Sequence, residues 1–118
     1  IEESSAAVKD ARINLADLSN VELVLGKTEE VLAKITPTPD CVILDPPRTG
    51  CHGDALQALV QTRPPRVVYV SCDPSSLARD LRVLCAEAYE LLEVQPVDMF
   101  PHTHHIECVA TLQRRPQG

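Results

Sequence analysis

With 118 residues, the chain is long enough for one domain with a hydrophobic core, but short for a complete doubly wound enzyme. Hydrophobic residues make up 44% and aromatic residues only 3%, so Val, Leu, Ile and Ala must form most of the core. The net charge of −6 argues against a protein that holds nucleic acid over its own broad surface, because phosphate contacts require basic side chains.

The first half of the chain predicts two helices and two strands. Apolar residues at helical spacing indicate an amphipathic helix over 4–18, followed by a strand over 21–25 and a short helix over 28–35. Two prolines make 36–39 a surface loop. The continuous apolar run 41–44 is typical of a parallel strand that is covered on both faces.

The second half continues the alternation and ends in a hairpin. We expect a helix near 54–61, a strand over 66–70 and a helix over 75–88. The runs 91–97 and 106–112 have no helix between them, so they should pair antiparallel. The sequence therefore predicts an α/β fold, with a mainly parallel sheet, helices on both faces and a terminal antiparallel hairpin.

Cysteine usage indicates a reducing compartment. The five cysteines are odd in number and form no Cys-x-x-Cys motif, so we expect free thiols in a cytoplasmic protein. The sequence contains no signal-peptide pattern and no apolar run long enough to span a membrane, so we expect no membrane partner.

Cys72 lies where an apolar strand ends and a helix can begin. Asp73 is a plausible N-cap and Pro74 fits the first helical turn. Backbone N–H groups and the positive end of a helix dipole favour a thiolate at such a position, and open α/β sheets place active sites at this edge. Cys72 is therefore a candidate nucleophile; the alternative is a small buried residue that closes a turn.

Asp45 closes the buried strand 41–44 and is followed by two prolines, which stiffen the backbone and withhold N–H donors. A carboxylate held at the C-terminal end of a strand is well placed to meet a ligand. The alternative is a turn former, which Asp-Pro often is. Arg48 is either a partner of Asp45 or of a substrate group, or a solvated surface residue.

Glu107 falls inside the last predicted strand. A carboxylate in an apolar strand is costly unless it is paired or serves as a general base. On the residues alone, we favour an outward position on an alternating strand, with Ile106 and Cys108 facing inward.

Three histidines and a cysteine raise the question of a zinc site near the end of the chain. No second pair of ligands is present elsewhere, and adjacent histidines on a strand point in opposite directions. We therefore favour hydrogen bonding within the loop over metal binding. The residues concerned are His102, His104, His105 and Cys108.

The chain begins with Ile1 and Glu2, which resemble the last residues of a strand. An acidic residue at the end of such a strand takes the ribose hydroxyls in nucleotide-binding α/β folds. The alternative for Glu2 is a charge that stabilises a helix N-terminus. No glycine-rich turn precedes it, so we expect that the start of the domain is missing.

Three segments together resemble the RNA uracil-C5 methyltransferase family. They are Ile-Leu-Asp-Pro-Pro-Arg-Thr-Gly at 43–50, Val-Ser-Cys-Asp-Pro-Ser-Ser-Leu-Ala-Arg-Asp at 70–80 and Asp-Met-Phe-Pro-His-Thr-His-His-Ile-Glu at 98–107. They occur in the order and spacing of the family, and the similarity covers nearly the whole chain. The resemblance implies a Rossmann-like class I fold and S-adenosylmethionine-dependent formation of 5-methyluridine in ribosomal or transfer RNA.

The resemblance also implies roles for single residues. Cys72 matches the nucleophile that adds to C6 of uracil, and Glu107 matches the base that removes the C5 proton. Asp45 matches a carboxylate of the cofactor site, and Glu2 matches the acid that binds ribose. An RNA base must be flipped out to reach such a pocket.

The chain departs from the family at several points. Asp73 stands where the family often has Asn, and Lys27 where some members have Asn near the adenine. The glycine-rich cofactor turn, its strand and any RNA-binding domain are absent. That strand is central in the usual methyltransferase sheet, between the strands that end at Glu2 and Asp45. We therefore expect 1–118 to be the C-terminal part of a catalytic domain, monomeric and inactive alone, which contacts RNA mainly through the missing region.

Two other interpretations stay open. Asp-Pro-Pro also resembles the Asp-Pro-Pro-aromatic motif of amino-directed methyltransferases, although Arg48 replaces the aromatic residue and such enzymes need no cysteine. The chain could also be a truncated, non-catalytic module, against which the intact Cys72 and Glu107 argue.

Overall fold

The computed structural model describes residues 1–98 and 106–117. Its elements along the chain are α1 (Ser5–Asn14), α2 (Thr28–Leu32), β1 (Cys41–Leu44), α3 (Gly53–Thr62), β2 (Arg66–Ser71), α4 (Pro74–Glu87), β3 (Tyr89–Val97) and β4 (Glu107–Arg114). None of the described helices combines the length and the apolar character that crossing a bilayer requires.

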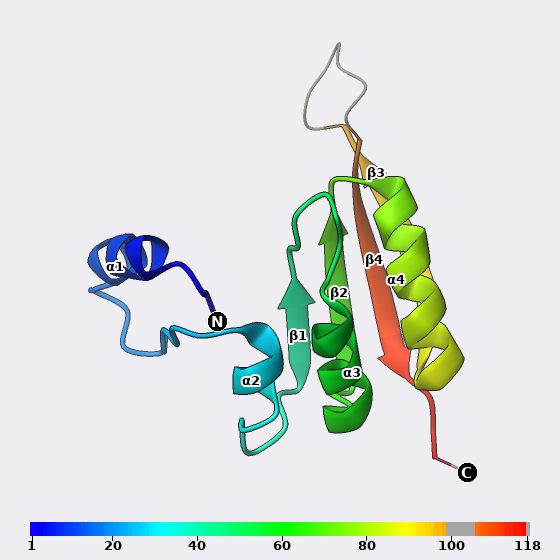
Figure 1. Cartoon of the computed structure of the whole chain (residues 1–118), viewed down its shortest axis with the longest axis horizontal. Coiled ribbons are helices and arrows are strands. Elements are labelled where there is room, and N and C mark those ends of the chain that lie inside the picture. Colours follow the sequence, from blue (N-terminus) through cyan, green and yellow to red (C-terminus); the bar gives the residue numbers. More distant parts are fainter. Residues whose placement is uncertain (99–105, 118) are drawn as a thin grey trace.

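The four strands form one mixed sheet in the order β1-β2-β4-β3 (Figure 1). β1 and β2 are parallel, and β4 pairs antiparallel with both β2 and β3. The α/β fold and the antiparallel pairing of the last two strands are thus confirmed. β3 lies outside β4, so the last strand of the chain, and not the one before it, borders β2.

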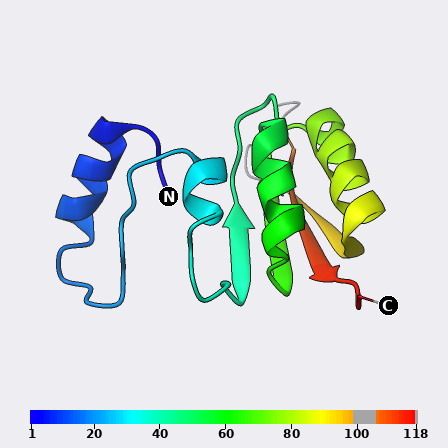
Figure 2. The same cartoon turned by 60° about the horizontal axis from the view of Figure 1, so that its bottom comes forward.

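The core lies between one face of the sheet and the helices α3 and α4, which pack side by side against it (Figure 2). Alternate residues of the central strands are buried there: Val67, Tyr69 and Ser71 in β2, and Cys108, Ala110 and Leu112 in β4. From its continuous apolar run, we expected other elements to cover both faces of β1. Instead Leu44 is 8% exposed and its neighbour Ile43 70%, because successive side chains point to opposite faces and the described helices α3 and α4 cover only one.

The N-terminal part of the chain, with α1, lies apart from the sheet on the side of β1 (Figures 1 and 2). The strand predicted over 21–25 is wrong as a regular element, since only Leu25 forms a parallel bridge, with Glu2. The backbone N–H of Glu2 donates to Val24 (3.0 Å) and that of Gly26 to Glu2 (2.9 Å). Two strands without a third are marginally stable, which explains why the pairing stays this short.

Leu59 of α3 is completely buried in the core. We expect Leu59→Ala to lower the free energy of unfolding by about 2–5 kcal/mol, because it removes buried methyl groups and leaves a cavity. Urea unfolding followed by circular dichroism measures this loss. Leu92→Ala, at a leucine of β3 that is 46% exposed, is the matched control. Equal losses in the two variants would contradict this packing.

Candidate active site

The register between β2 and β4 leads the predicted nucleophile toward the predicted base. Ser71, the last residue of β2, lies opposite Cys108. Continued by one residue, the same register sets Cys72 opposite Glu107. Residues directly opposite each other in an antiparallel pair have their side chains on the same face, with Cβ atoms about 4.5–5.5 Å apart. Both side chains are half-buried.

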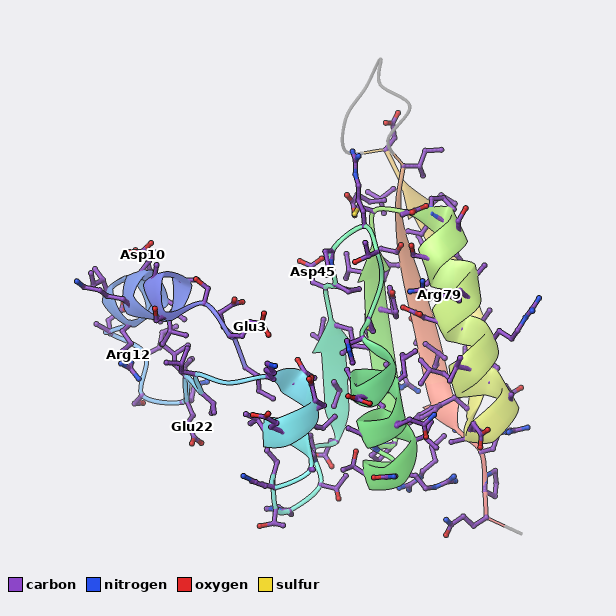
Figure 3. The ribbon with its side chains drawn as sticks, viewed as in Figure 1. Glu3, Asp10, Arg12, Glu22, Asp45 and Arg79 are labelled. Carbon is purple, nitrogen blue, oxygen red and sulfur yellow. The ribbon has the colours of Figure 1, made fainter. Side chains whose placement is uncertain are left out.

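Asp45 follows the last residue of β1 and is exposed. Because β1 and β2 are parallel, with Leu44 beside Tyr69, their C-terminal ends meet at one edge of the sheet. Figure 3 shows Asp45 beyond the end of β1, at this edge. Three of the four predicted site residues therefore follow or begin strands at the same edge.

The start of α4 is built as the sequence predicted. The side chain of Asp73 caps the helix by accepting the N–H of Ser75 (3.1 Å), and Pro74 is the first helical residue. The hydroxyl of Ser71 donates to the Asp73 carbonyl (2.8 Å) and accepts the Asp73 N–H (3.1 Å). Cys72 is held between these two anchored residues, next to the positive end of a fourteen-residue helix.

Glu2 lies in the separate N-terminal part. Its Oε1 accepts the N–H of Ser4 (3.1 Å), and among the described residues no hydrogen bond or ion pair joins it to the other three candidates. Glu2 lines a pocket of about 280 Å³ together with Ile1, Ala7, Val8, Ala11, Leu23 and Val24. The role of Glu2 at the ribose therefore stays a prediction.

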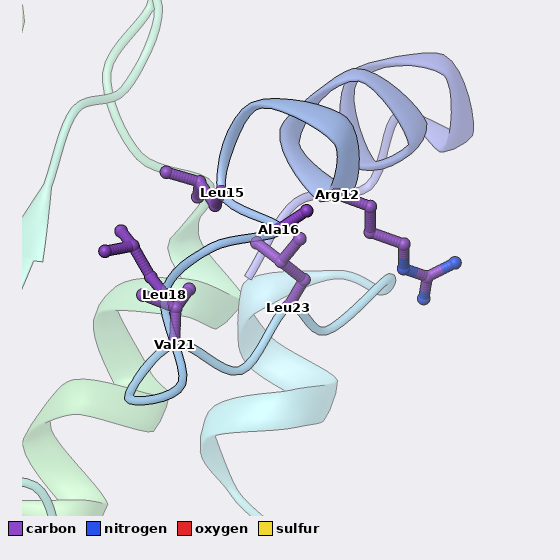
Figure 4. Close-up of a pocket in the computed structure, with 6 residues that line it drawn as sticks. All are labelled: Arg12, Leu15, Ala16, Leu18, Val21 and Leu23. Atoms are coloured by element: carbon purple, nitrogen blue, oxygen red, sulfur yellow. The ribbon is translucent and has the colours of Figure 1, made fainter.

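A second pocket, of about 270 Å³, lies between α1 and the segment that follows it (Figure 4). Its lining is apolar apart from Arg12, and comprises Leu15, Ala16, Leu18, Val21 and Leu23. It contains none of the predicted site residues, so it does not belong to the candidate active site.

The metal hypothesis for the histidines near the end of the chain stays untested. His102, His104 and His105 lie outside the described residues. Within the part of the chain that is described, Glu29, His52 and Asp54 are the group whose ligand atoms approach one another closely enough for an ion. His52 Nδ1 already accepts the N–H of Asp54 (3.1 Å) as the cap of α3, so we assign no metal to this group.

Asp80, which was not among the candidates predicted from the sequence, is fully buried on α4. Its Oδ2 accepts the hydroxyl of Tyr69 (2.5 Å) and the N–H of Cys51 (2.8 Å). Burial, together with Asp80, raises the pKa of Cys51 to about 11 and that of Tyr69 well above its usual value. The missed signal was a carboxylate on the apolar stripe of α4, between Leu77 and Leu84.

Gly50 lies where the loop after Asp45 meets α4. It has φ +82°, and a Cβ there would come within 2.5 Å of Arg79 Nη2 and 2.7 Å of Asp80 Oδ2. We expect Gly50→Ala to cost at least about 1–2 kcal/mol of unfolding free energy from the backbone alone. Gly53→Ala is the control, since no atom lies within 4 Å of its added Cβ, and it should be neutral or stabilising. Urea titrations with equal midpoints would refute the close approach.

Known proteins match almost the whole chain. The family described as tRNA (Uracil-5-)-methyltransferase matches residues 2–115. An uncharacterised RNA methyltransferase of Oceanobacillus iheyensis is 48% identical over 117 residues, which are 95% of this chain and 26% of that protein. Another, of Gloeobacter violaceus, is 49% identical over 108 residues, 92% of this chain and 23% of that protein. The chain spans about a quarter of the length of these relatives.

Solved structures agree with this match. The tRNA (uracil-54, C5)-methyltransferase of Pyrococcus abyssi, in complex with S-adenosyl-L-homocysteine, has a TM-score of 0.75 and 35% identity, over 93% of this chain and 27% of that one. Precorrin-6y C5,15-methyltransferase of Geobacter metallireducens, at 20% identity and a TM-score of 0.74 over 96% of this chain and 66% of that one, supports the fold alone. The family match over nearly the full length and the Pyrococcus structure lead to one conclusion: this chain belongs to the tRNA (uracil-5-)-methyltransferase family.

Proposed function

We propose that the protein methylates C5 of a uridine in RNA, with S-adenosyl-L-methionine as cofactor, Cys72 as nucleophile and Glu107 as base. The observation that carries this proposal is the β2–β4 register, which leads Cys72 and Glu107 to opposite positions. Cys72 and Glu107 are 35 residues apart in the sequence, and both lie within the stretch that the family matches.

We also propose how this chain relates to the whole protein. Because the chain spans about a quarter of its relatives, we infer that 1–118 is the C-terminal part of the catalytic domain of a longer, cytoplasmic, monomeric protein. Its RNA, ribosomal or transfer, would be bound mainly by the remaining part. The net charge of −6 supports this division, since a chain of that charge has few cations to spare for phosphates.

Two carboxylates of this chain suit the two parts of S-adenosyl-L-methionine, its positively charged end and its ribose. Asp45, exposed at the strand edge, offers a carboxylate to the positively charged part of the cofactor. Glu2 lines the 280 Å³ pocket and offers carboxylate oxygens to the ribose hydroxyls. When bound, S-adenosyl-L-methionine supplies the electrophilic methyl group.

Cys72 performs the first step on the RNA base. Its thiolate forms a bond to C6 of the flipped uracil, and the electron pair of the C5–C6 double bond moves toward C5 and the C4 carbonyl oxygen. C5 thereby becomes the carbon nucleophile that accepts the methyl group. The anchored turn at Ser71 and Asp73 holds the thiol in place for this addition.

Glu107 completes the reaction. Its carboxylate takes the remaining proton from C5, and the electron pair of that C–H bond re-forms the C5–C6 double bond. The Cys72–C6 bond breaks as this double bond forms, and the sulfur leaves with that electron pair as thiolate. Cys72 is thus regenerated, and the net result is replacement of the C5 proton by a methyl group.

Nucleoside analysis tests the function. The full-length protein is incubated with methyl-labelled S-adenosyl-L-methionine and with unmodified ribosomal and transfer RNA, and the digested nucleosides are separated and weighed by mass spectrometry. We expect the label in 5-methyluridine. Label on an exocyclic amino group would instead support an amino-directed enzyme, and no transfer to any of these RNAs would contradict the proposal.

A further inference from the structure

Asp80 is the one charged side chain that is completely buried among the described residues. A buried carboxylate is costly unless several donors satisfy it. Here Oδ2 accepts from Tyr69 and from the Cys51 N–H, and Oδ1 accepts from Arg79 Nε (3.2 Å). These donors come from β2, from the loop after β1 and from α4 itself. Asp80 therefore joins three parts of the candidate site that are distant in sequence.

The loop 46–51, which follows Asp45, is attached to α4 at three successive points. The hydroxyl of Ser76 donates to the carbonyl of Arg48, and Arg79 Nη2 donates to the carbonyl of Thr49. The Cys51 N–H donates to Asp80 at 2.8 Å. Arg79 and Asp80 follow Ser76 by three and four positions, so the three residues lie on one side of the first turns of α4. Figure 3 labels Arg79 there.

The contact between this loop and α4 leaves no room for a side chain at its centre. Gly50 is buried, and its missing Cβ would lie within 2.7 Å of Asp80 Oδ2. The backbone of the loop thus lies directly on the helix. Because the same helix begins two residues after Cys72, its first turns are connected to both Asp45 and Cys72.

We propose that Asp80 is a positioning residue for methyl transfer: it holds the loop 46–51 on α4 and so sets Asp45 relative to Cys72. This inference rests on the proposed function, because it assigns Asp45 to the cofactor and Cys72 to the uracil. A methyl group passes between two bound molecules only when the reacting atoms are held within about 3–3.5 Å of each other. A loop that leaves α4 would move the cofactor away while the thiol stays in place.

Cys51 is a built-in reporter of this attachment. Its thiol is half-buried, and burial followed by Asp80 raises its pKa to about 11, so it should react slowly with iodoacetamide while the loop is docked. Alkylation measured by mass spectrometry at each cysteine reports how often the loop opens. The same digest reports Cys72, whose reactivity should not depend on the loop.

Two variants of the full-length protein test the inference. Ser76→Ala removes the anchor to Arg48, together with a longer contact to Asp73 Oδ2 (3.2 Å), and leaves the charge of Asp80 intact. We expect alkylation of Cys51 to rise about fivefold, as the loss of one anchoring hydrogen bond allows. Asp80→Asn removes charge-assisted bonds, and the rise should be about tenfold or more. In both variants kcat for methylation should fall by a similar factor, while the KM for RNA and the alkylation rate of Cys72 stay within about twofold.

Matched controls lie on the same helix. Ser75→Ala removes an exposed hydroxyl for which the described residues show no hydrogen bond, and Glu87→Gln neutralises an exposed carboxyl at the far end of α4. Both should behave as the wild type. A purely structural role would lower the melting temperature without raising Cys51 alkylation or lowering kcat well below that temperature.

The outcomes separate this inference from the proposed function. If the wild type makes 5-methyluridine but Ser76→Ala matches Ser75→Ala in Cys51 alkylation and in kcat, the positioning role is refuted alone. The same holds if Cys51 alkylation rises and kcat does not fall. Should Asp80→Asn fail to fold, Ser76→Ala decides. A wild type without uracil methylation refutes the proposed function and this role together.

Discussion

Replacing Cys72 by alanine should abolish methylation, with kcat reduced by a factor on the order of 10⁴ or more, as for other enzymes that lose a covalent nucleophile. Without the thiolate, C6 receives no electron pair and C5 stays too weak a nucleophile to accept a methyl group. The fold should survive, because Cys72 is only half-buried and the N-cap of α4 is the side chain of Asp73.

RNA that contains 5-fluorouracil gives the direct measurement. Fluorine at C5 cannot leave as a proton does, so the Cys72–C6 bond should persist and yield a complex that survives denaturation. Cys72→Ala should form no such complex. Cys41→Ala is the matched control, since Cys41 is an exposed thiol at the opposite end of β1, and it should retain both the complex and the activity. Methylation retained by Cys72→Ala would exclude the mechanism.

Replacing Glu107 by glutamine should stop the reaction after methyl transfer. Glutamine cannot take the C5 proton, and loss of a general base lowers kcat about 10²–10⁴-fold. Because elimination of Cys72 requires that proton to leave, we expect a covalent complex with ordinary, unfluorinated RNA. This complex should be visible on denaturing gels.

Two further variants separate this trapping from a general loss of activity. The double variant with Cys72→Ala should form no complex, because the trapped bond is the one to Cys72. Glu90→Gln changes a glutamate of β3 that lies opposite Gln113, at the other end of the hairpin, and should leave turnover normal. If Glu107→Gln turned over normally, the base would have to be another residue.

The sequence predicted the local structure of the site well. The strand before Cys72, the cap at Asp73 and the helix after it are all present, because a β-branched run, an N-cap and a proline in the first turn act over a few residues. The strand predicted over 21–25 is wrong. A strand is stable only when neighbouring strands pair with it, and the residue types in 21–25 do not tell whether such neighbours are there.

The sequence predicts the face of the strand on which Glu107 lies, but not the strand beside it. Its alternation with the buried Cys108 is confirmed, whereas Ile106, expected inside, precedes β4 and is 48% exposed. The alternation along the strand placed Glu107 on the face of the sheet away from the helices. From the residues alone, that face looked exposed to solvent. Its position next to β2 depends on the strand order, which is decided by hydrogen bonds between distant segments.

Asp80 was not recognised for a related reason. On a helix, a carboxylate among leucines is an anomaly that the sequence displays but does not explain. Its donors, Tyr69 and the N–H of Cys51, lie 11 and 29 residues away and meet it only when β2, α4 and the loop 46–51 pack together.

The sequence by itself pointed to the residues that we propose for the chemistry and determined the short elements that hold them, since motifs and caps are local. Only the tertiary structure decided that β4 lies beside β2, so that Glu107 comes opposite Cys72, and that Asp80 joins the Asp45 loop to the helix after Cys72. The physical reason is that register and burial are set by contacts across the whole chain, where hydrophobic packing and paired buried groups select one arrangement.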